Sequence, residues 1–84
     1  MMKSANLSRV RSPFAKKVVE ELDKLERSQA WLARRCDVTN ATINRILNDN
    51  AIPSLSTLYQ ISKQLKLDFT ELALLIVKEI GDGN

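Results

Sequence analysis

Residues 28–48 restrict the possible folds of this chain more than any other segment. Apolar residues recur there at helical spacing in two short runs, and only two or three residues separate the two expected helices. Helices joined by so tight a turn lie at a large angle to each other, so the second can project from the body of the protein. The segment therefore predicts a helix-turn-helix unit.

Three further helices are predicted around this unit, and each of the five starts at a residue that can cap a helix N-terminus. The expected N-cap residues are Ser12, Ser28, Thr39, Ser54 and Asp68. The first helix is expected over about residues 13–26, the second ends near 36, and Gly81 ends the last. No segment shows the alternation typical of a strand, so the predicted fold is all-α with five short helices.

Apolar spacing predicts which side of each helix faces the core. The first helix is expected to bury Phe14, Val18, Leu22 and Leu25, and the fourth to bury Leu55, Leu58, Ile61 and Leu65. The single cysteine, Cys36, lies on the inner face of the second helix and is predicted to be a core residue.

Composition excludes several classes of protein. One cysteine cannot form an intrachain disulfide, which suits a reducing cytoplasm, and the absence of histidine argues against a zinc site, so no metal or cofactor is predicted. The longest apolar run, Leu72 to Val77, is far shorter than the about 20 residues that span a membrane, so a soluble protein is expected. With no histidine, no glycine-rich phosphate loop and no evident pair of buried acids, we do not expect an enzyme.

Charge is distributed unevenly along the chain. Residues 1–45 contain 10 Lys and Arg against 5 Asp and Glu, a balance of +5, and residues 46–84 contain 3 against 5, a balance of −2. A basic half suits a polyanionic partner, with ordinary surface asymmetry as the alternative. Residues 1–12 are predicted to be a flexible basic arm, in which Lys3, Arg9 and Arg11 could contact DNA.

The outer face of the third predicted helix carries amides and one guanidinium but no acid. Asparagine can pair bidentately with adenine, arginine with guanine, and a small methyl group can pack against the thymine methyl. A helix face that is merely solvated more often carries Glu and Lys, and Asn lowers helix propensity. We therefore predict that this face reads bases in the major groove, through Asn40, Ala41, Asn44 and Arg45.

Four stretches in register resemble the lambda-repressor-like, or Cro/repressor (xenobiotic response element), helix-turn-helix domains. They are Gln29-Ala-Trp-Leu-Ala, Val38-Thr-Asn-Ala-Thr-Ile-Asn-Arg-Ile, Pro53-Ser-Leu-Ser-Thr-Leu and Leu67-Asp-Phe-Thr-Glu-Leu72, within a similarity over about residues 14–76. The resemblance implies a five-helix domain whose third helix enters the major groove, usually as a dimer on a palindrome. It also implies contacts to the DNA backbone by Gln29, Thr39, Thr42 and Asn48.

The chain departs from this family where glycine is usual after three helices. Asp37, Asp49 and Lys66 occupy those positions, and aspartate tolerates the left-handed conformation better than most residues. Any of three lysines on the first helix could supply the usual phosphate contact; they are Lys16, Lys17 and Lys24.

The last helix is expected to make a homodimer. A helical wheel places Phe69, Leu72, Ala73, Ile76 and Ile80 on the core side and leaves three apolar residues outside, Leu74, Leu75 and Val77. We thus divide the chain into the arm at 1–12, a DNA-binding domain with a dimerisation helix at 13–81, and a tail at 82–84.

The predicted function is a sequence-specific double-stranded DNA-binding transcription regulator. A phage-type repressor, a Cro-like protein and a restriction–modification controller all fit this description. The alternative is the antitoxin of a toxin–antitoxin pair, which acts by covering a protein partner. A toxin or a polymerase is therefore a second candidate partner beside operator DNA.

Overall fold

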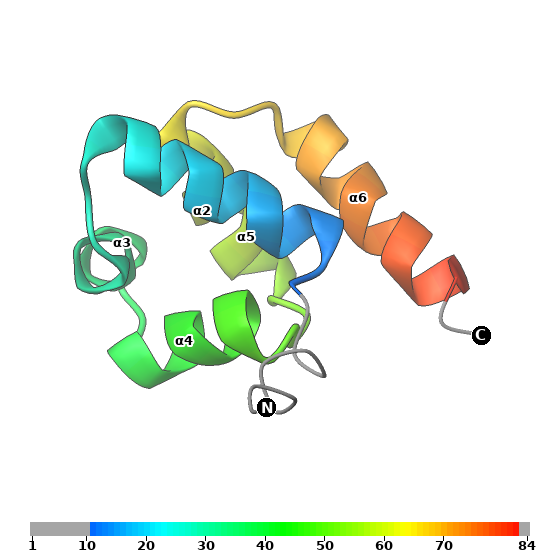
Figure 1. Ribbon diagram of the computed structural model, residues 1–84, viewed down its shortest axis with the longest axis horizontal. Coiled ribbons are helices and arrows are strands. Elements are labelled where there is room, and N and C mark those ends of the chain that lie inside the picture. Colours follow the sequence, from blue (N-terminus) through cyan, green and yellow to red (C-terminus); the bar gives the residue numbers. More distant parts are fainter. Residues whose placement is uncertain (1–10, 83–84) are drawn as a thin grey trace, which may run out of the picture.

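Five helices make up the part of the chain, residues 11–82, that the computed structural model describes (Figure 1). They are α2 (Pro13–Leu25), α3 (Gln29–Cys36), α4 (Asn40–Asn48), α5 (Leu55–Leu65) and α6 (Phe69–Asp82). No strand occurs within these residues, which confirms the all-α prediction. None of the helices described is long and apolar enough to cross a membrane.

The helices start where the capping side chains predict. Ser28 Oγ accepts the Trp31 N–H at 3.0 Å, and Thr39 Oγ1 accepts the Thr42 N–H at 3.1 Å. Ser12 and Ser54 cap α2 and α5 in the same way, and the Asp68 carboxylate accepts the Glu71 N–H at 2.9 Å. Each such cap stabilises its helix by about 1 kcal/mol because it satisfies an N–H that has no partner within the helix.

The core is almost entirely aliphatic and lies between α2 and the other helices. α2 packs against α4, α5 and α6, and α3 packs against α4 and α5. The largest fully buried side chains are Phe14, Leu32, Ile43, Leu47, Ile61, Leu72 and Val18. Leu25 and Leu55, both expected in the core, are instead 46% and 73% exposed. They are the last residue of α2 and the first of α5, where the neighbouring helices no longer cover the helix end.

Left-handed residues end three of the helices without any glycine. Glu26, Asp37 and Lys66 have φ of 56°, 59° and 57° and follow α2, α3 and α5. Asp37 therefore replaces glycine as expected. The same prediction for Asp49 is wrong, because its φ is −114° and Asn50 takes the left-handed conformation instead, at 57°. The Asp49 and Ala51 N–H groups both bind the Arg45 carbonyl, so the chain reverses one residue later.

We expect Lys66→Gly to stabilise the protein. A side chain in the left-handed region costs roughly 1–2 kcal/mol, which exceeds the entropy that glycine loses on folding, roughly 0.5–1 kcal/mol. Urea denaturation should therefore show a free energy of unfolding higher by about 0.5–1 kcal/mol. The matched control is Lys63→Gly inside α5, which should lower it by about 1 kcal/mol. A loss of stability in Lys66→Gly would contradict this account.

The α6 helix is packed differently from the wheel prediction. Leu75 is half-buried against the core and Ile80 is 44% exposed, the reverse of what we expected. The cause is α2, which covers the flank of α6 that carries Leu75: the Glu79 carboxylate on that helix accepts the Phe14 N–H at 3.1 Å. An acid at a helix N-terminus is electrostatically favourable. Gly81, expected to end α6, lies within it.

Cys36 is buried, as predicted, with 5% of its surface exposed. Burial raises the pKa of its thiol from 9.0 to about 11, because the charged thiolate is poorly solvated there. The folded protein then holds this proton more tightly than the unfolded chain. The stabilisation that the protonated Cys36 thiol gives to the folded protein is therefore fully present below the pKa of this thiol in the unfolded chain. It is lost as the pH rises through the pKa of the thiol in the folded protein.

We expect the free energy of unfolding to fall by up to about 3 kcal/mol between the two pKa values of Cys36, because each pKa unit is worth about 1.4 kcal/mol. Urea denaturation at a series of alkaline pH values measures this loss. Cys36→Ala is the control, since every other titrating group is shared by the two proteins. The same pH dependence in both proteins would show that the thiol has no part in it.

Candidate DNA-binding interface

The α4 helix lies at one side of the bundle and presents a polar face to solvent. In Figure 1 it runs along the lower edge while α3, beside it, is seen end-on, so the two helices cross at a large angle. Its inward side chains, Ile43, Ile46 and Leu47, are buried and hold it against α2 and α3. All four residues predicted to read bases are exposed: Asn40, Ala41, Asn44 and Arg45.

No acidic residue occurs in α4, so nothing on that helix repels a polyanion. Within residues 11–82, the Arg45 guanidinium has no hydrogen-bond or ion-pair partner. Holding an arginine in an internal ion pair would reduce its capacity to bind a base. Among the residues that the structure describes, this arginine is therefore available to an external ligand.

Thr39 and Thr42 form a pair at the N-terminus of α4. Their hydroxyl oxygens are 2.9 Å apart, and Thr39 Oγ1 also accepts the Thr42 backbone N–H. Two hydroxyl groups supply two protons, and the bond between them uses only one. The other proton remains a donor at a helix N-terminus, where an anionic oxygen is electrostatically favoured. Gln29 is half-buried in the first turn of α3.

Arg11 is held against the C-terminal end of α4, a contact that sequence reasoning missed. Its Nε donates to the Leu47 carbonyl at 3.1 Å and its Nη2 donates to Asn48 Oδ1 at 2.9 Å. A cation at this end of a helix is favoured by the helix dipole. Because Asn48 Oδ1 is engaged by Arg11, its Nδ2 group remains the donor for an outside acceptor. The partners in these bonds are separated by 36 and 37 positions in the sequence, so no local pattern predicts the contact.

The neighbouring Ser12 strengthens the same junction. Its backbone N–H donates to Asn50 Oδ1 at 2.9 Å, and its side chain caps α2. The start of α2 is thus tied to the end of α4 through both Arg11 and Ser12. Of the three predicted arm residues, Lys3 and Arg9 lie outside the described residues.

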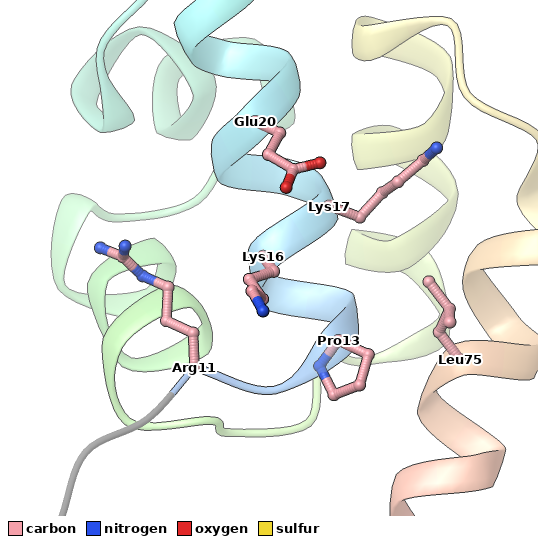
Figure 2. Close-up of a pocket in the computed structure, with 6 residues that line it drawn as sticks. All are labelled: Arg11, Pro13, Lys16, Lys17, Glu20 and Leu75. Atoms are coloured by element: carbon pink, nitrogen blue, oxygen red, sulfur yellow. The ribbon is translucent and has the colours of Figure 1, made fainter. Parts of the chain in front are cut away.

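Arg11 lines a hollow of about 350 Å³ together with Leu75 of α6 and four residues of α2, which are Pro13, Lys16, Lys17 and Glu20. Figure 2 shows Arg11 reaching across α4, with Lys16 on the adjacent stretch of α2, whereas Lys17 points to the side of α5 and α6. Lys24 is at the far end of α2, in an ion pair with Glu21 at 3.3 Å. Lys16 and Lys17 therefore share a hollow with Arg11, which is bound to the end of α4, whereas Lys24 does not.

We expect Arg11→Ala to lower affinity for DNA about tenfold, because it removes two charge-assisted hydrogen bonds that orient α4 and Asn48. Arg11→Lys is the informative control. Lysine keeps the charge but cannot bridge the two acceptors as the guanidinium does. Titration of labelled duplex DNA measures both. If Arg11→Lys bound DNA as well as the unchanged protein, Arg11 would act only through its charge.

Comparison with known proteins agrees with this geometry. A helix-turn-helix family model matches residues 18–72, a range that contains all of α3, α4 and α5 and reaches into α2 and α6. Searches of curated proteins and of solved structures give no match. The matched range covers more than half of the 84 residues. The chain therefore belongs to the Cro/C1-type helix-turn-helix family of DNA-binding transcription regulators.

Proposed function

We propose that this regulator recognises a specific operator by inserting α4 into the major groove of double-stranded DNA. One observation carries the proposal: the exposed side of α4 holds three residue types suited to base edges and no acid. Arg45 would bind guanine O6 and N7, Asn40 and Asn44 would bind adenine, and Ala41 would pack against a thymine methyl. The groove is about 12 Å wide and admits a helix.

The backbone contacts proposed around α4 set its position in the groove. Gln29, Thr39 and Thr42 lie at the N-terminal ends of α3 and α4, where N–H groups and hydroxyls favour phosphate. On the opposite side, Asn48 presents its Nδ2 group and Lys16 its ammonium. Contacts of this kind fix the register and orientation on DNA, while the bases supply specificity.

We propose further that the protein binds as a homodimer through α6. The outer side of this helix exposes Leu74, Val77 and Ile80, at 62%, 61% and 44%. Apolar patches on small proteins often mark partner sites. The half-buried Leu75, which we had included, now lies at the margin of this surface. A two-fold dimer would place the two α4 helices in successive major grooves, about 34 Å apart, and the operator would be a pseudo-palindrome.

Selection of bound sites from random duplex DNA with the purified full chain tests this function. We expect enrichment of an inverted repeat that contains guanine and adenine, with binding that weakens steeply as salt rises, because phosphate contacts release counterions. The Arg45→Ala variant, carried through the same selection, should lose the preference at one base position in each half-site. An antitoxin that acts only on a protein partner would enrich no sequence, and that result would overturn the proposal.

A further inference from the structure

A second recess, separate from the hollow that Arg11 lines, lies where the C-terminal ends of α2 and α5 meet α3. Its volume is about 270 Å³, and its lining residues are Leu25, Arg27, Trp31, Gln64, Leu65 and Lys66. The two leucines and the half-buried indole form an apolar floor. Leu25, which is unexpectedly exposed at the end of α2, is one of the residues that line this recess. We call it the Trp31 pocket.

Two arginines flank the indole. The Arg27 guanidinium carbon is 5.0 Å from the Trp31 ring centroid and that of Arg35 is 5.7 Å from it, both within the range of cation–π attraction. Arg35 Nε also donates to Gln64 Oε1 at 3.1 Å. The aromatic ring and these contacts hold the polar groups of the pocket in place.

The polar side chains that line the Trp31 pocket are mostly hydrogen-bond donors. Arginine, lysine and the tryptophan indole are donors with no acceptor, and the acceptor oxygen of Gln64 is engaged by Arg35. None of the six lining residues is acidic. At the ends of α2 and α5, backbone N–H groups of the caps bind the carbonyls of residues 22, 23, 62 and 63. The chemistry that fits is an apolar group beside one or more carboxylates.

The position of the Trp31 pocket separates it from the proposed DNA contact. In Figure 1 the ends of α2 and α5 lie at the upper side of the bundle, α4 lies at the lower side, and α3 lies between them. DNA bound along α4 would therefore leave the pocket open. The volume is slightly below the roughly 300–1,000 Å³ typical of small-molecule sites, and it suits one protruding side chain.

We propose that the Trp31 pocket docks an acidic segment of a partner protein, which inserts one apolar side chain against the indole. Carboxylates on either side of that residue pair with Arg27 and Lys66. Charge complementarity and the apolar floor together favour such a segment over DNA, whose phosphates would leave the floor unfilled. The partner could then engage the protein while α4 occupies the groove.

Selection from a displayed library of random short peptides, with the full chain as bait, tests the proposal. We expect enriched peptides to place Leu or Phe next to Asp or Glu. A synthetic peptide of that kind should change the emission of Trp31, the only tryptophan of the chain, in a saturable way. Its counterpart with Gln in place of the acids should bind at least about tenfold more weakly, because the charge-assisted bonds are gone.

Variants distinguish binding of the peptide in the Trp31 pocket from nonspecific attraction between the acidic peptide and a basic protein. Arg27→Gln combined with Lys66→Gln should weaken binding of the acidic peptide by at least about tenfold. Lys63→Gln, which removes a positive charge from an exposed position of α5, should not weaken it. Operator binding by both proteins should be unchanged. The proposal is overturned if no acidic–apolar peptide is enriched, if the Lys63 variant weakens binding equally, or if duplex DNA itself occupies the pocket and shifts the Trp31 emission.

Discussion

Arg45→Ala should lower affinity for the selected operator by roughly 5- to 150-fold, a loss of about 1–3 kcal/mol, while affinity for random duplex DNA changes much less. The reason is geometric. Arg45 is the only charged side chain on the exposed face of α4, and no internal partner within residues 11–82 competes for its guanidinium. A bidentate pair with guanine would be lost only at the specific site.

Competition titrations with operator and random duplexes measure the two affinities side by side. Arg34→Ala, which removes an exposed arginine from α3 and leaves α4 intact, is the matched control. It should change both affinities by a similar, small factor. If Arg45→Ala weakened operator and random DNA equally, Arg45 would be a phosphate contact and the assignment of base reading to it would be wrong.

Leu74→Glu combined with Val77→Lys is expected to convert the proposed homodimer into a folded monomer. Both side chains are exposed, so the helix and the core should survive the change. The monomer should bind a full operator at least about 100-fold more weakly, because the second half-site no longer benefits from a linked partner. Sedimentation gives the oligomeric state, and thermal unfolding shows that the fold is kept.

The chain provides its own control for this experiment in a second exposed apolar surface. Ile52 and Leu55, before and at the start of α5, are 58% and 73% exposed. Ile52→Glu with Leu55→Lys introduces the same charges there and should leave the dimer intact. If the control variant were monomeric and the α6 variant still dimeric, the interface would lie at the start of α5 instead of on α6. A wild-type protein that sediments as a monomer throughout would remove the dimer altogether.

The starts of the helices could be read from the sequence because N-capping is local chemistry. Ser12, Ser28, Thr39, Ser54 and Asp68 each bind an N–H three residues ahead, and such short contacts depend little on the rest of the fold. The same holds for the two faces of α4, whose apolar spacing alone separates Ile43 from Asn44. The family pattern reinforced these predictions, and the family match over residues 18–72 agrees with them.

Contacts between distant segments could be seen only in the tertiary structure. Arg11 reaches Leu47 and Asn48, and Glu79 reaches the start of α2, 65 positions away, because packing brings helix ends together that share no sequence signal. Leu75 and Ile80 exchanged their expected environments for a related reason. A wheel gives the direction of a side chain around its own helix, but whether that side is covered depends on where α2 crosses α6.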